Sequence, residues 1–281
     1  MKILIKSLIP GLLKRKIQIN KQKKKLEKVS YRKCETTTLI YKDKIHKEDI
    51  VNSTDIEKQW IQSKKKIEEF DVPDGTGGVN PGDRKAIYYL ISYFKPSSVL
   101  EIETHIGAST LNIASALYEQ RISQDKDAHL TTVDIHDVND PETNRWLDFN
   151  TSYSPRQMIS GLKFEGFVQF QTASSIDFAK SCPDTYDFIF LDGSHEADIV
   201  YQEIPLMLKL LKENGVILLH DYFPNLQPLW SDGGVIPGPW LAVNRLKEEG
   251  ADLSAIPLGM VPWNTKLNSH YTSLALLTRN S

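Results

Sequence analysis

Short apolar runs alternate with longer stretches of helical periodicity from about residue 81 to the C-terminus. Runs of this kind, rich in β-branched and aromatic residues, are typical of strands, whereas apolar positions three and four apart indicate helices. We expect strands at 98–103, 129–134, 167–172, 186–192, 215–220, 253–257 and 272–277, and helices at 81–94, 107–124, 155–165, 196–212 and 239–249. The first five strands are nearly all apolar, so both faces of their sheet must be covered, as in a parallel, doubly wound α/β fold.

The first eighty residues follow another pattern. Residues 41–70 combine many charges with a few large apolar side chains such as Trp60 and Phe70, and predict one or two helices that cover the body. The Asp-Gly-Thr-Gly-Gly run at 74–78 then predicts a break. We therefore expect a basic N-terminal arm over residues 1–40, a helical cover over 41–80 and one α/β domain over 81–281.

Charge separates the arm from the body. Residues 1–33 hold twelve Lys or Arg and a single acid, Glu27, which gives a local charge of +11, while the whole chain has a net charge of −2. The remainder is therefore at −13, and an acidic body of this kind is not expected to hold nucleic acid.

The arm has two open interpretations. Met1, Leu4, Ile5, Leu8, Ile9, Leu12 and Leu13 recur at helical spacing with lysines between them, although Pro10 and Gly11 weaken the pattern. A basic amphipathic helix would lie on an anionic membrane surface or dock on a partner. A solvated, disordered Lys-rich tail is the alternative. No apolar stretch followed by a small-residue cleavage site indicates a secretory signal.

The amino-acid composition limits the class of protein and its expected location in the cell. With 40% hydrophobic and 25% charged residues the chain fits a globular protein, and no apolar run approaches the length of a membrane-spanning helix. Cys34 and Cys182 stand in different segments and indicate neither a disulfide framework nor a zinc knuckle. We expect a cytoplasmic protein, with peripheral membrane contact through residues 1–33 as one option; a homo-oligomer is left open.

Polar residues follow the predicted strands where each strand ends. The first strand leads into a turn whose following N–H groups, at Gly107, Ala108 and Ser109, are free to receive an anion. Asp134 ends the second strand, where an acid can accept both hydroxyls of a ribose. A nucleoside-containing cofactor is implied, although the glycine fingerprint of dinucleotide enzymes is missing.

Two further strand ends carry acids and histidines. Asp192 ends the fourth strand with His195 three positions later, and His220 and Asp221 end the fifth. Carboxylate and imidazole groups at adjacent strand ends can present oxygen and nitrogen ligands to a divalent ion, so Asp192, His220 and Asp221 are the predicted metal ligands. His195 is the predicted base. The alternative is that His195 caps the following helix and Asp221 caps a turn.

The run from Val99 to Thr110 resembles the first motif of class I S-adenosylmethionine-dependent methyltransferases, and the segments 186–195 and 210–221 resemble the later strands of that family. The resemblance spans residues 80–278 and implies a Rossmann-like, three-layer αβα fold with a seven-stranded, mostly parallel sheet whose last strand is antiparallel. It also implies S-adenosyl-L-methionine as cofactor. Metal-dependent small-molecule O-methyltransferases of the family place an Asp at the end of strand four and a Lys or His three positions on, as Asp192 and His195 stand here.

The resemblance assigns cofactor contacts residue by residue. Asp134 corresponds to the ribose-binding acid. The remaining contacts implied are Glu101, Gly107, Ala108 and Ser109 for the methionine part, Ser174 and Ser175 of the 173–175 turn for the adenine edge, and Asp192. Glu103 stands where the family usually carries Gly, so it must turn away from the cofactor, weaken its binding or block the pocket.

These features predict an S-adenosylmethionine-dependent O-methyltransferase acting on a hydroxyl of a small molecule or glycan, assisted by Mg²⁺ or another divalent cation. One alternative is an enzyme resembling cephalosporin hydroxylase on the same fold. Another is a non-catalytic scaffold in which Glu103 closes the cofactor pocket. The long connections 136–154 and 222–240 are expected to shape the acceptor site. Trp146, Tyr153, Trp230 and Trp240 would form its wall, with Arg145 and Arg156 for an anionic acceptor.

Overall fold

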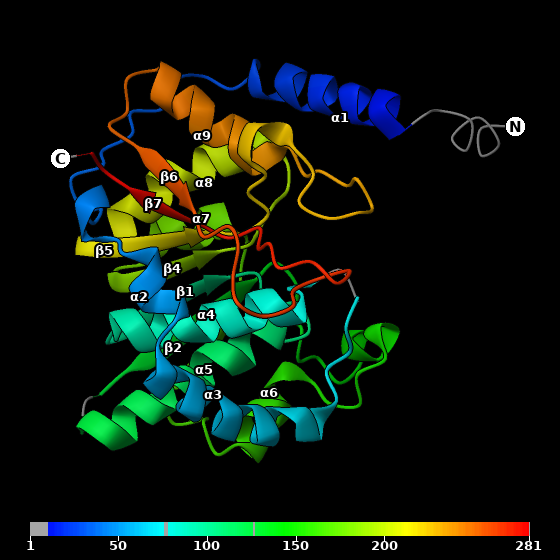
Figure 1. Ribbon diagram of the computed structural model, residues 1–281, viewed down its shortest axis with the longest axis vertical. Coiled ribbons are helices and arrows are strands. Elements are labelled where there is room, and N and C mark those ends of the chain that lie inside the picture. The colour runs from blue at the N-terminus through cyan, green and yellow to red at the C-terminus, as the bar shows by residue number, and fades with distance from the viewer. Residues whose placement is uncertain (1–10, 76–77, 126, 281) are drawn as a thin grey trace, which may run out of the picture.

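A seven-stranded sheet forms the centre of the protein, seen in a computed structural model that describes residues 11–75, 78–125 and 127–280 (Figure 1). The strand order is β3-β2-β1-β4-β5-β7-β6. β1 to β5 pair in parallel, whereas β7 is antiparallel to both of its neighbours. The predicted fold class is therefore confirmed, including the antiparallel last strand. The order reverses between β1 and β4, and ligands of such sheets bind beside that point.

The strands lie close to their predicted positions. They are β1 Ser98–Ile102, β2 His129–Asp134, β3 Val168–Thr172, β4 Tyr186–Leu191, β5 Leu211–Leu219, β6 Ser254–Pro257 and β7 Ala275–Thr278. β5 begins four residues earlier than expected and takes over the end of the preceding predicted helix. Leu211 already pairs with Tyr186 of β4, and a register shift follows before Val216 meets Phe188.

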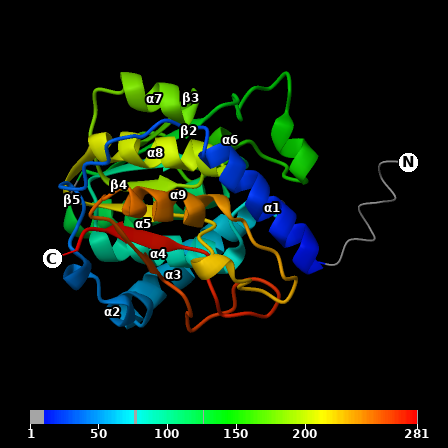
Figure 2. The ribbon, with the colours of Figure 1, turned by 90° about the horizontal axis from the view of Figure 1, so that it is seen from above.

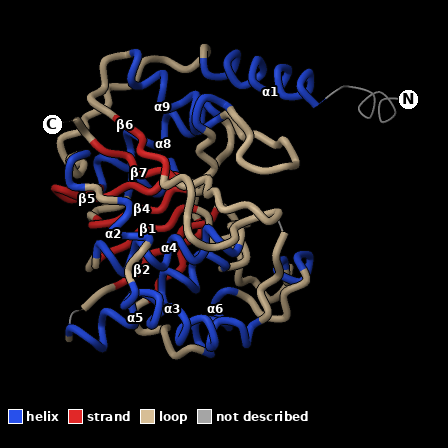
Figure 3. Tube along the Cα trace, viewed as in Figure 1, coloured by secondary structure: helices blue, strands red, loops and turns tan. Residues whose placement is uncertain are grey.

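Helices cover both faces of the sheet, as the apolar strands require. The α-helices are α1 Gly11–Leu26, α2 Lys47–Val51, α3 Thr54–Ile67, α4 Pro81–Phe94, α5 Ala108–Gln124, α6 Pro155–Gly161, α7 Ser175–Ser181, α8 Ala197–Leu210 and α9 Gly238–Glu248. α3 to α6 share one apolar core with alternate strand residues such as Val99 and Phe188, while α7, α8 and α9 share the other with Leu100 and Ile189. Figures 1 and 3 show the sheet between these two layers.

Local sequence explains where several helices begin. Asn80 accepts hydrogen bonds from the Gly82 and Asp83 amides and is followed by Pro81, so α4 has both a cap and a favourable first residue. Ser154 and Gln157 form a capping box at α6. α6 ends at Gly161, earlier than predicted, and α7 was not predicted at all.

One or two covering helices were predicted at 41–70, and two α-helices, α2 and α3, lie there; α3 packs on α4 and α5. The N-terminal arm differs from the disordered-tail alternative over its described part, because residues 11–26 form α1, which lies across α8 and α9 (Figure 2). The earlier part of the predicted amphipathic helix, residues 1–10, falls outside the described residues. Within the described chain no helix is long and apolar enough to cross a bilayer.

Candidate active site

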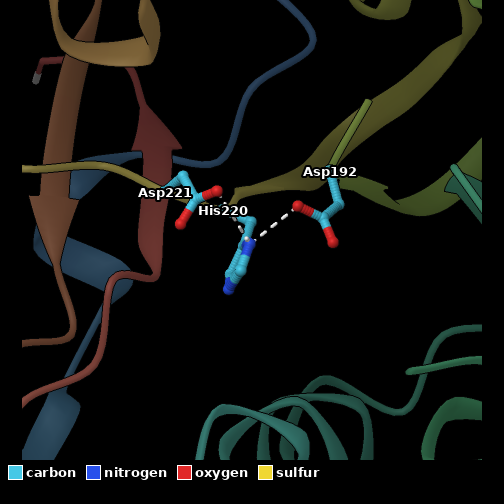
Figure 4. Close-up of side chains that lie close together, drawn as sticks. All are labelled: Asp192, His220 and Asp221. Carbon is cyan, nitrogen blue, oxygen red and sulfur yellow. Dashed lines mark hydrogen bonds and ion pairs between the residues drawn. The ribbon is translucent and has the colours of Figure 1, made fainter. Parts of the chain in front are cut away.

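The predicted acids and histidines meet at the carboxyl ends of β4 and β5. Asp192, His220 and Asp221 each place a ligand atom within 4.8 Å of the others. Figure 4 shows the Asp192 and Asp221 carboxylates on either side of the His220 ring. Nδ1 of His220 lies 2.7 Å from an Asp192 oxygen and 3.7 Å from an Asp221 oxygen. The structure therefore brings these three predicted residues together.

A third carboxylate lies on the opposite side of the His220 ring. Nε2 of His220 is 3.2 Å from Oδ2 of Asp83, a completely buried side chain at the start of α4. The Ser273 hydroxyl also donates to Asp83 Oδ2, at 3.1 Å. Burial alone would lower the pKa of His220, but Asp192, Asp221 and Asp83 raise it well above its usual value. In the metal-free protein His220 is therefore an imidazolium among three acids.

His195 reaches the same group from the loop after β4. Its Nδ1 lies 3.3 Å from Oδ2 of Asp221, and half of its side chain is exposed. A carboxylate at this distance orients the ring. The alternative that His195 caps α8 is wrong, because Gln22 of α1 accepts the hydrogen bond from the first amide of α8, at Ala197.

A cavity of about 480 Å³ opens beside β1, β2 and β3. Asp134, Ser174 and Ser175 line it, as predicted for the ribose and adenine contacts. Asp134 is buried, and its two oxygens accept the backbone amides of His105 and His136, both at 2.9 Å. These bonds fix both chain segments at the mouth of the cavity, and each carboxylate oxygen keeps further acceptor capacity.

A smaller cavity joins the Asp/His group to the N-terminus of α5. Ala108 and Ser109 line it together with Asp192, His195, His220 and Asp221. α5 begins after Gly107, whose φ is +78°, and no side chain caps the helix. The prediction for Gly107 is wrong, because its amide donates to the Thr104 carbonyl at 2.8 Å and the residue lines neither cavity. The first-turn amides of Ala108 and Ser109 remain as the anion-binding feature that the sequence indicated.

Glu103 lines both cavities. Its φ is +78°, in the left-handed region that glycine adopts without strain, and this explains why a glycine suits the position. Burial, with the nearby Asp192, Asp134, Glu203 and Asp221, raises the pKa of Glu103 to about 8. At pH 7 its side chain is therefore mainly a neutral acid, standing between the two cavities.

Glu101 lies deeper than the sequence suggested. Its side chain is completely buried on the α4 and α5 side of β1, accepts hydrogen bonds from the Thr110 and Thr132 hydroxyls at 2.6 and 2.7 Å, and lines neither cavity. The direct contact with the cofactor that the sequence predicted for Glu101 is therefore not found, because the side chain lines neither cavity and its Oε2 accepts both threonine hydroxyls. Burial raises its pKa to about 7.

The three predicted metal ligands fit a divalent ion. Asp192 and Asp221 offer oxygens and His220 offers Nδ1, while Asp83 faces the other ring nitrogen, as an outer carboxylate does at a metal-binding histidine. Two carboxylates and one imidazole are the ligands of Mn²⁺, Fe²⁺ or Zn²⁺ more than of Mg²⁺, which prefers oxygen alone. A metal ion bound at Nδ1 of His220 and the proton that Nδ1 shares with Asp192 cannot be present at the same time.

Sequence reasoning missed several residues of the site. Asp83 belongs to a predicted helix, and only its position just after a helix start could have drawn attention to it. Glu203 on α8 is almost fully buried, lines the large cavity and accepts a 2.5 Å hydrogen bond from Ser175. His105 stacks edge-on against Phe149, with ring centroids 4.4 Å apart, and closes the same cavity.

The predicted aromatic acceptor wall does not assemble. Trp146 and Arg145 line the cofactor-side cavity, whereas Trp230 packs with Phe223 and Val235 in a small cluster of its own. The other members of the predicted wall are also placed elsewhere: Tyr153 lies against Phe70, Trp240 packs against the α8 and α9 core, and Arg156 lies over Phe170. Long loops can therefore carry aromatic side chains that serve the packing of the loop itself.

A third cavity, of about 580 Å³, lies between α3 and the N-terminal ends of α4 and α5. Trp60, Lys64 and Trp263 are on its wall, and Ala108 lines both this cavity and the small one. Lys85, also on the wall, lies 4.6 Å from the centre of the Trp263 ring and pairs with Glu57 at 2.6 Å. This cavity is the aromatic-lined space that adjoins the Asp/His group.

Comparison with known proteins agrees with this geometry. Residues 100–222 match the model of a family described as "Methyltransferase domain". A search of curated proteins found no match. The segment that matches runs from β1 to the end of β5 and so contains Glu103, Asp134, Asp192 and the His220–Asp221 pair.

Solved structures share the fold at low sequence identity. A putative O-methyltransferase from Klebsiella pneumoniae is 15% identical, with a TM-score of 0.52, and the match covers 79% of this chain and 90% of that one. The O-methyltransferase TomG from Streptomyces achromogenes, in complex with SAM, is 18% identical with a TM-score of 0.51, over 79% and 90% of the two chains. An O-methyltransferase from Bacillus cereus in complex with SAH is 17% identical, with a TM-score of 0.51 and coverage of 83% and 94%. Residues 100–222 therefore resemble a methyltransferase domain, and the fold is the one that these solved O-methyltransferase structures have.

Proposed function

We propose that this methyltransferase is an O-methyltransferase that passes a methyl group from S-adenosyl-L-methionine to a hydroxyl of a small molecule or sugar. The observation that carries the proposal is the pair of cavities that meet at Glu103. One is lined by the ribose-type acid Asp134, and the other by the Asp192, His220 and Asp221 group with His195. Structures of the same fold that bind SAM or SAH, described above, support the choice of cofactor.

The larger cavity suits a nucleoside. Asp134 would accept the ribose hydroxyls, Ser174 and Ser175 would face the adenine edge, and apolar residues such as Ile135 and Val133 would contact the ring. Because Glu103 is mainly neutral at pH 7, it can donate a hydrogen bond and does not repel the cofactor carboxylate as an anion would. This supports cofactor binding over the closed-pocket alternative.

The small cavity suits the transfer step. The acceptor oxygen attacks the methyl carbon, the C–S bond breaks as the C–O bond forms, and S-adenosylhomocysteine leaves. His195, oriented by Asp221, would take the hydroxyl proton. A divalent ion held by Asp192, His220 and Asp221 would lower the pKa of the acceptor hydroxyl. Positioning of the two reactants would supply much of the remaining rate.

We further propose that the acceptor approaches from the cavity between α3 and α4. This cavity shares Ala108 with the small one, and Trp60 and Trp263 offer flat apolar surfaces for an aromatic ring or a sugar face. Because the aromatic residues of the two long loops do not form a common wall, this cavity is the better candidate for the acceptor site.

Calorimetric titration of the full chain with S-adenosylhomocysteine tests the proposal, with and without Mg²⁺ or Mn²⁺. We expect micromolar binding that weakens about tenfold or more in Asp134→Asn, because a neutral amide accepts the ribose hydroxyls less well than a carboxylate. Glu142→Gln, an exposed change in the neighbouring loop, is the matched control. No binding by the natural chain, together with binding by Glu103→Gly, would instead establish the closed-pocket scaffold.

A further inference from the structure

The outer face of α1 is a basic surface with an apolar centre, and it belongs to neither cavity. Leu13 and Ile17 lie one helical turn apart and are 48% and 51% exposed. Lysines surround them on the same exposed side of the helix: Lys14, Lys16, Lys21, Lys23 and Lys24. None of these five lysines forms an ion pair with another residue that the structure describes.

The inner face of the same helix is already occupied. Gln22 and Leu26 are buried against the body, and Ile19 is half-buried on the same side. Lys25 pairs with Glu196 at 2.6 Å, and the Gln22 amide donates to the same carboxylate at 2.7 Å. The exposed apolar pair therefore cannot be covered by turning the helix without breaking these contacts.

The outer face of α1 can act as a binding surface because the orientation of the helix on the body is fixed. At the C-terminal end of α1, the Arg245 guanidinium donates to the Leu26 carbonyl and, at 2.8 Å, to the Val29 carbonyl. Arg245 also lies over the Tyr201 ring, 4.2 Å from its centre. The helix is thus held at its end while Leu13, Ile17 and their lysines are presented outward.

We propose that this face docks on an anionic phospholipid bilayer. Exposed aliphatic side chains flanked by lysines match the headgroup boundary, where apolar groups enter and ammonium groups meet lipid phosphates. Nucleic acid would use the lysines but gains nothing from Leu13 and Ile17, and the rest of the chain carries −13, which opposes a long polyanion. The preceding residues 1–9 add five Ile or Leu and two Lys to the sequence at this end of the helix.

The N-terminal end of α1 lies on the same side of the molecule as the site. In both views the N-terminal end of α1 lies on the side of the molecule that carries the loop between β5 and α9, which follows His220 and Asp221 (Figures 1 and 2). The N-terminal end of a membrane-bound α1 would therefore lie near this edge of the sheet.

Co-sedimentation of the full chain with vesicles tests the proposal, using phosphatidylcholine alone and phosphatidylcholine with phosphatidylglycerol. We expect pelleting only with the anionic vesicles, and loss of it at high salt. Replacing four outer lysines by Gln (Lys14, Lys16, Lys21 and Lys24) should weaken partitioning on the order of a hundredfold. The double change Leu13→Gln and Ile17→Gln should weaken it about tenfold.

Controls keep the result interpretable. Four exposed lysines elsewhere, changed to Gln together, should leave pelleting unaltered: Lys44, Lys65, Lys180 and Lys209. Circular dichroism and a thermal melt would show that each variant is folded. Equal pelleting by the natural chain and the outer-lysine variant would overturn the proposal. So would binding to duplex DNA, unaffected by the Leu13 and Ile17 changes, without any binding to anionic vesicles.

Discussion

At the residue scale, Glu103 combines two unfavourable features, a left-handed backbone and a carboxyl group whose burial raises its pKa to about 8. An unfolded Glu titrates near its ordinary value of about 4.3. Between these two pH values the unfolded chain releases a proton that the folded chain retains, so folding stability falls as pH rises. Below the lower value the effect vanishes.

We therefore expect Glu103→Gln to reduce the loss of stability between pH 5 and pH 8.5, by about 4 kcal/mol. Urea unfolding at both pH values measures this. Glu101 and Glu203 also have raised pKa values and remain in both proteins, so only the difference between the two pH dependences is informative. Identical dependences in the variant and the natural chain would show that the Glu103 carboxyl does not titrate as described.

His220 gives a second prediction at this scale. Because three carboxylates surround its ring, we expect both ring nitrogens to be protonated at pH 7.5 in the metal-free protein. Ring ¹⁵N chemical shifts would show it directly. Asp83→Asn removes one of the three carboxyl groups around the ring and should lower the pKa of His220. A neutral ring at pH 7.5 in the natural chain would contradict the assignment.

At the element scale, the helix α9 begins in contact with the loop that carries His195. A Cβ built on Gly238 would lie 2.1 Å from the His195 carbonyl oxygen and 3.1 Å from the Ala197 amide nitrogen. Both neighbours are backbone atoms, so an added methyl group must displace either α9 or the loop.

Gly238→Ala is therefore expected to destabilise the fold by about 1–3 kcal/mol and to lower methyl transfer more than cofactor binding. Unfolding curves and paired activity and binding assays would separate the two effects. Gly166→Ala, at a glycine with open space around its Cβ, is the matched control. Transfer activity equal to that of the control would mean that the position of His195 does not matter.

Elements with a strong periodic signal could be predicted from the sequence, and short ones could not. The seven strands and α4, α5, α8 and α9 agree to within a few residues, because each buries a regular apolar pattern. α7 has seven residues and begins at a Ser174 cap that also reads as a loop. The extra length of β5, over residues 211–214, could not be predicted because the polar residues Lys212, Glu213 and Asn214 are typical of a helix end or a turn.

The site divides in the same way. Asp134, Asp192, His220 and Asp221 end strands, so the topology of a parallel sheet dictates that they share one edge. Asp83 comes from a helix far away in sequence, and only the packing of α4 brings it to His220. The direction of a side chain could not be predicted from the sequence either. Glu101 and Glu103 are two residues apart, yet Glu101 faces two threonines and Glu103 faces the cavities.

At the scale of the whole molecule, α1 joins the N-terminus to the last third of the chain. Gln22 supplies the cap that α8 lacks within its own sequence, since Glu196 makes no side-chain cap there. Deletion of residues 1–29 would remove the hydrogen-bond partners that Glu196 and Arg245 have in this segment. It would also expose the apolar surface that Leu26 covers.

We expect that deletion to lower the free energy of unfolding by about 2–4 kcal/mol, and the melting temperature by roughly 5–15 °C. Differential scanning calorimetry would measure it. A deletion of residues 1–10 alone, which leaves the Gln22 and Leu26 contacts in place, serves as the control. If both deletions melted alike, α1 would not contribute to the stability of the body.

Docking of α1 also depends on the order in which the chain is made. The helix is synthesised first, but Glu196 and Arg245 lie 174 and 219 residues beyond the atoms of Gln22 and Leu26 that they bind. At translation rates of about 5–20 residues per second, the ribosome needs roughly 10–45 s to reach Arg245 after Leu26. Until Glu196 has been made, roughly 9–35 s after Gln22, neither of these two partners of the lysine-rich segment exists. An anionic surface near the ribosome would therefore meet this segment before the body of the enzyme exists.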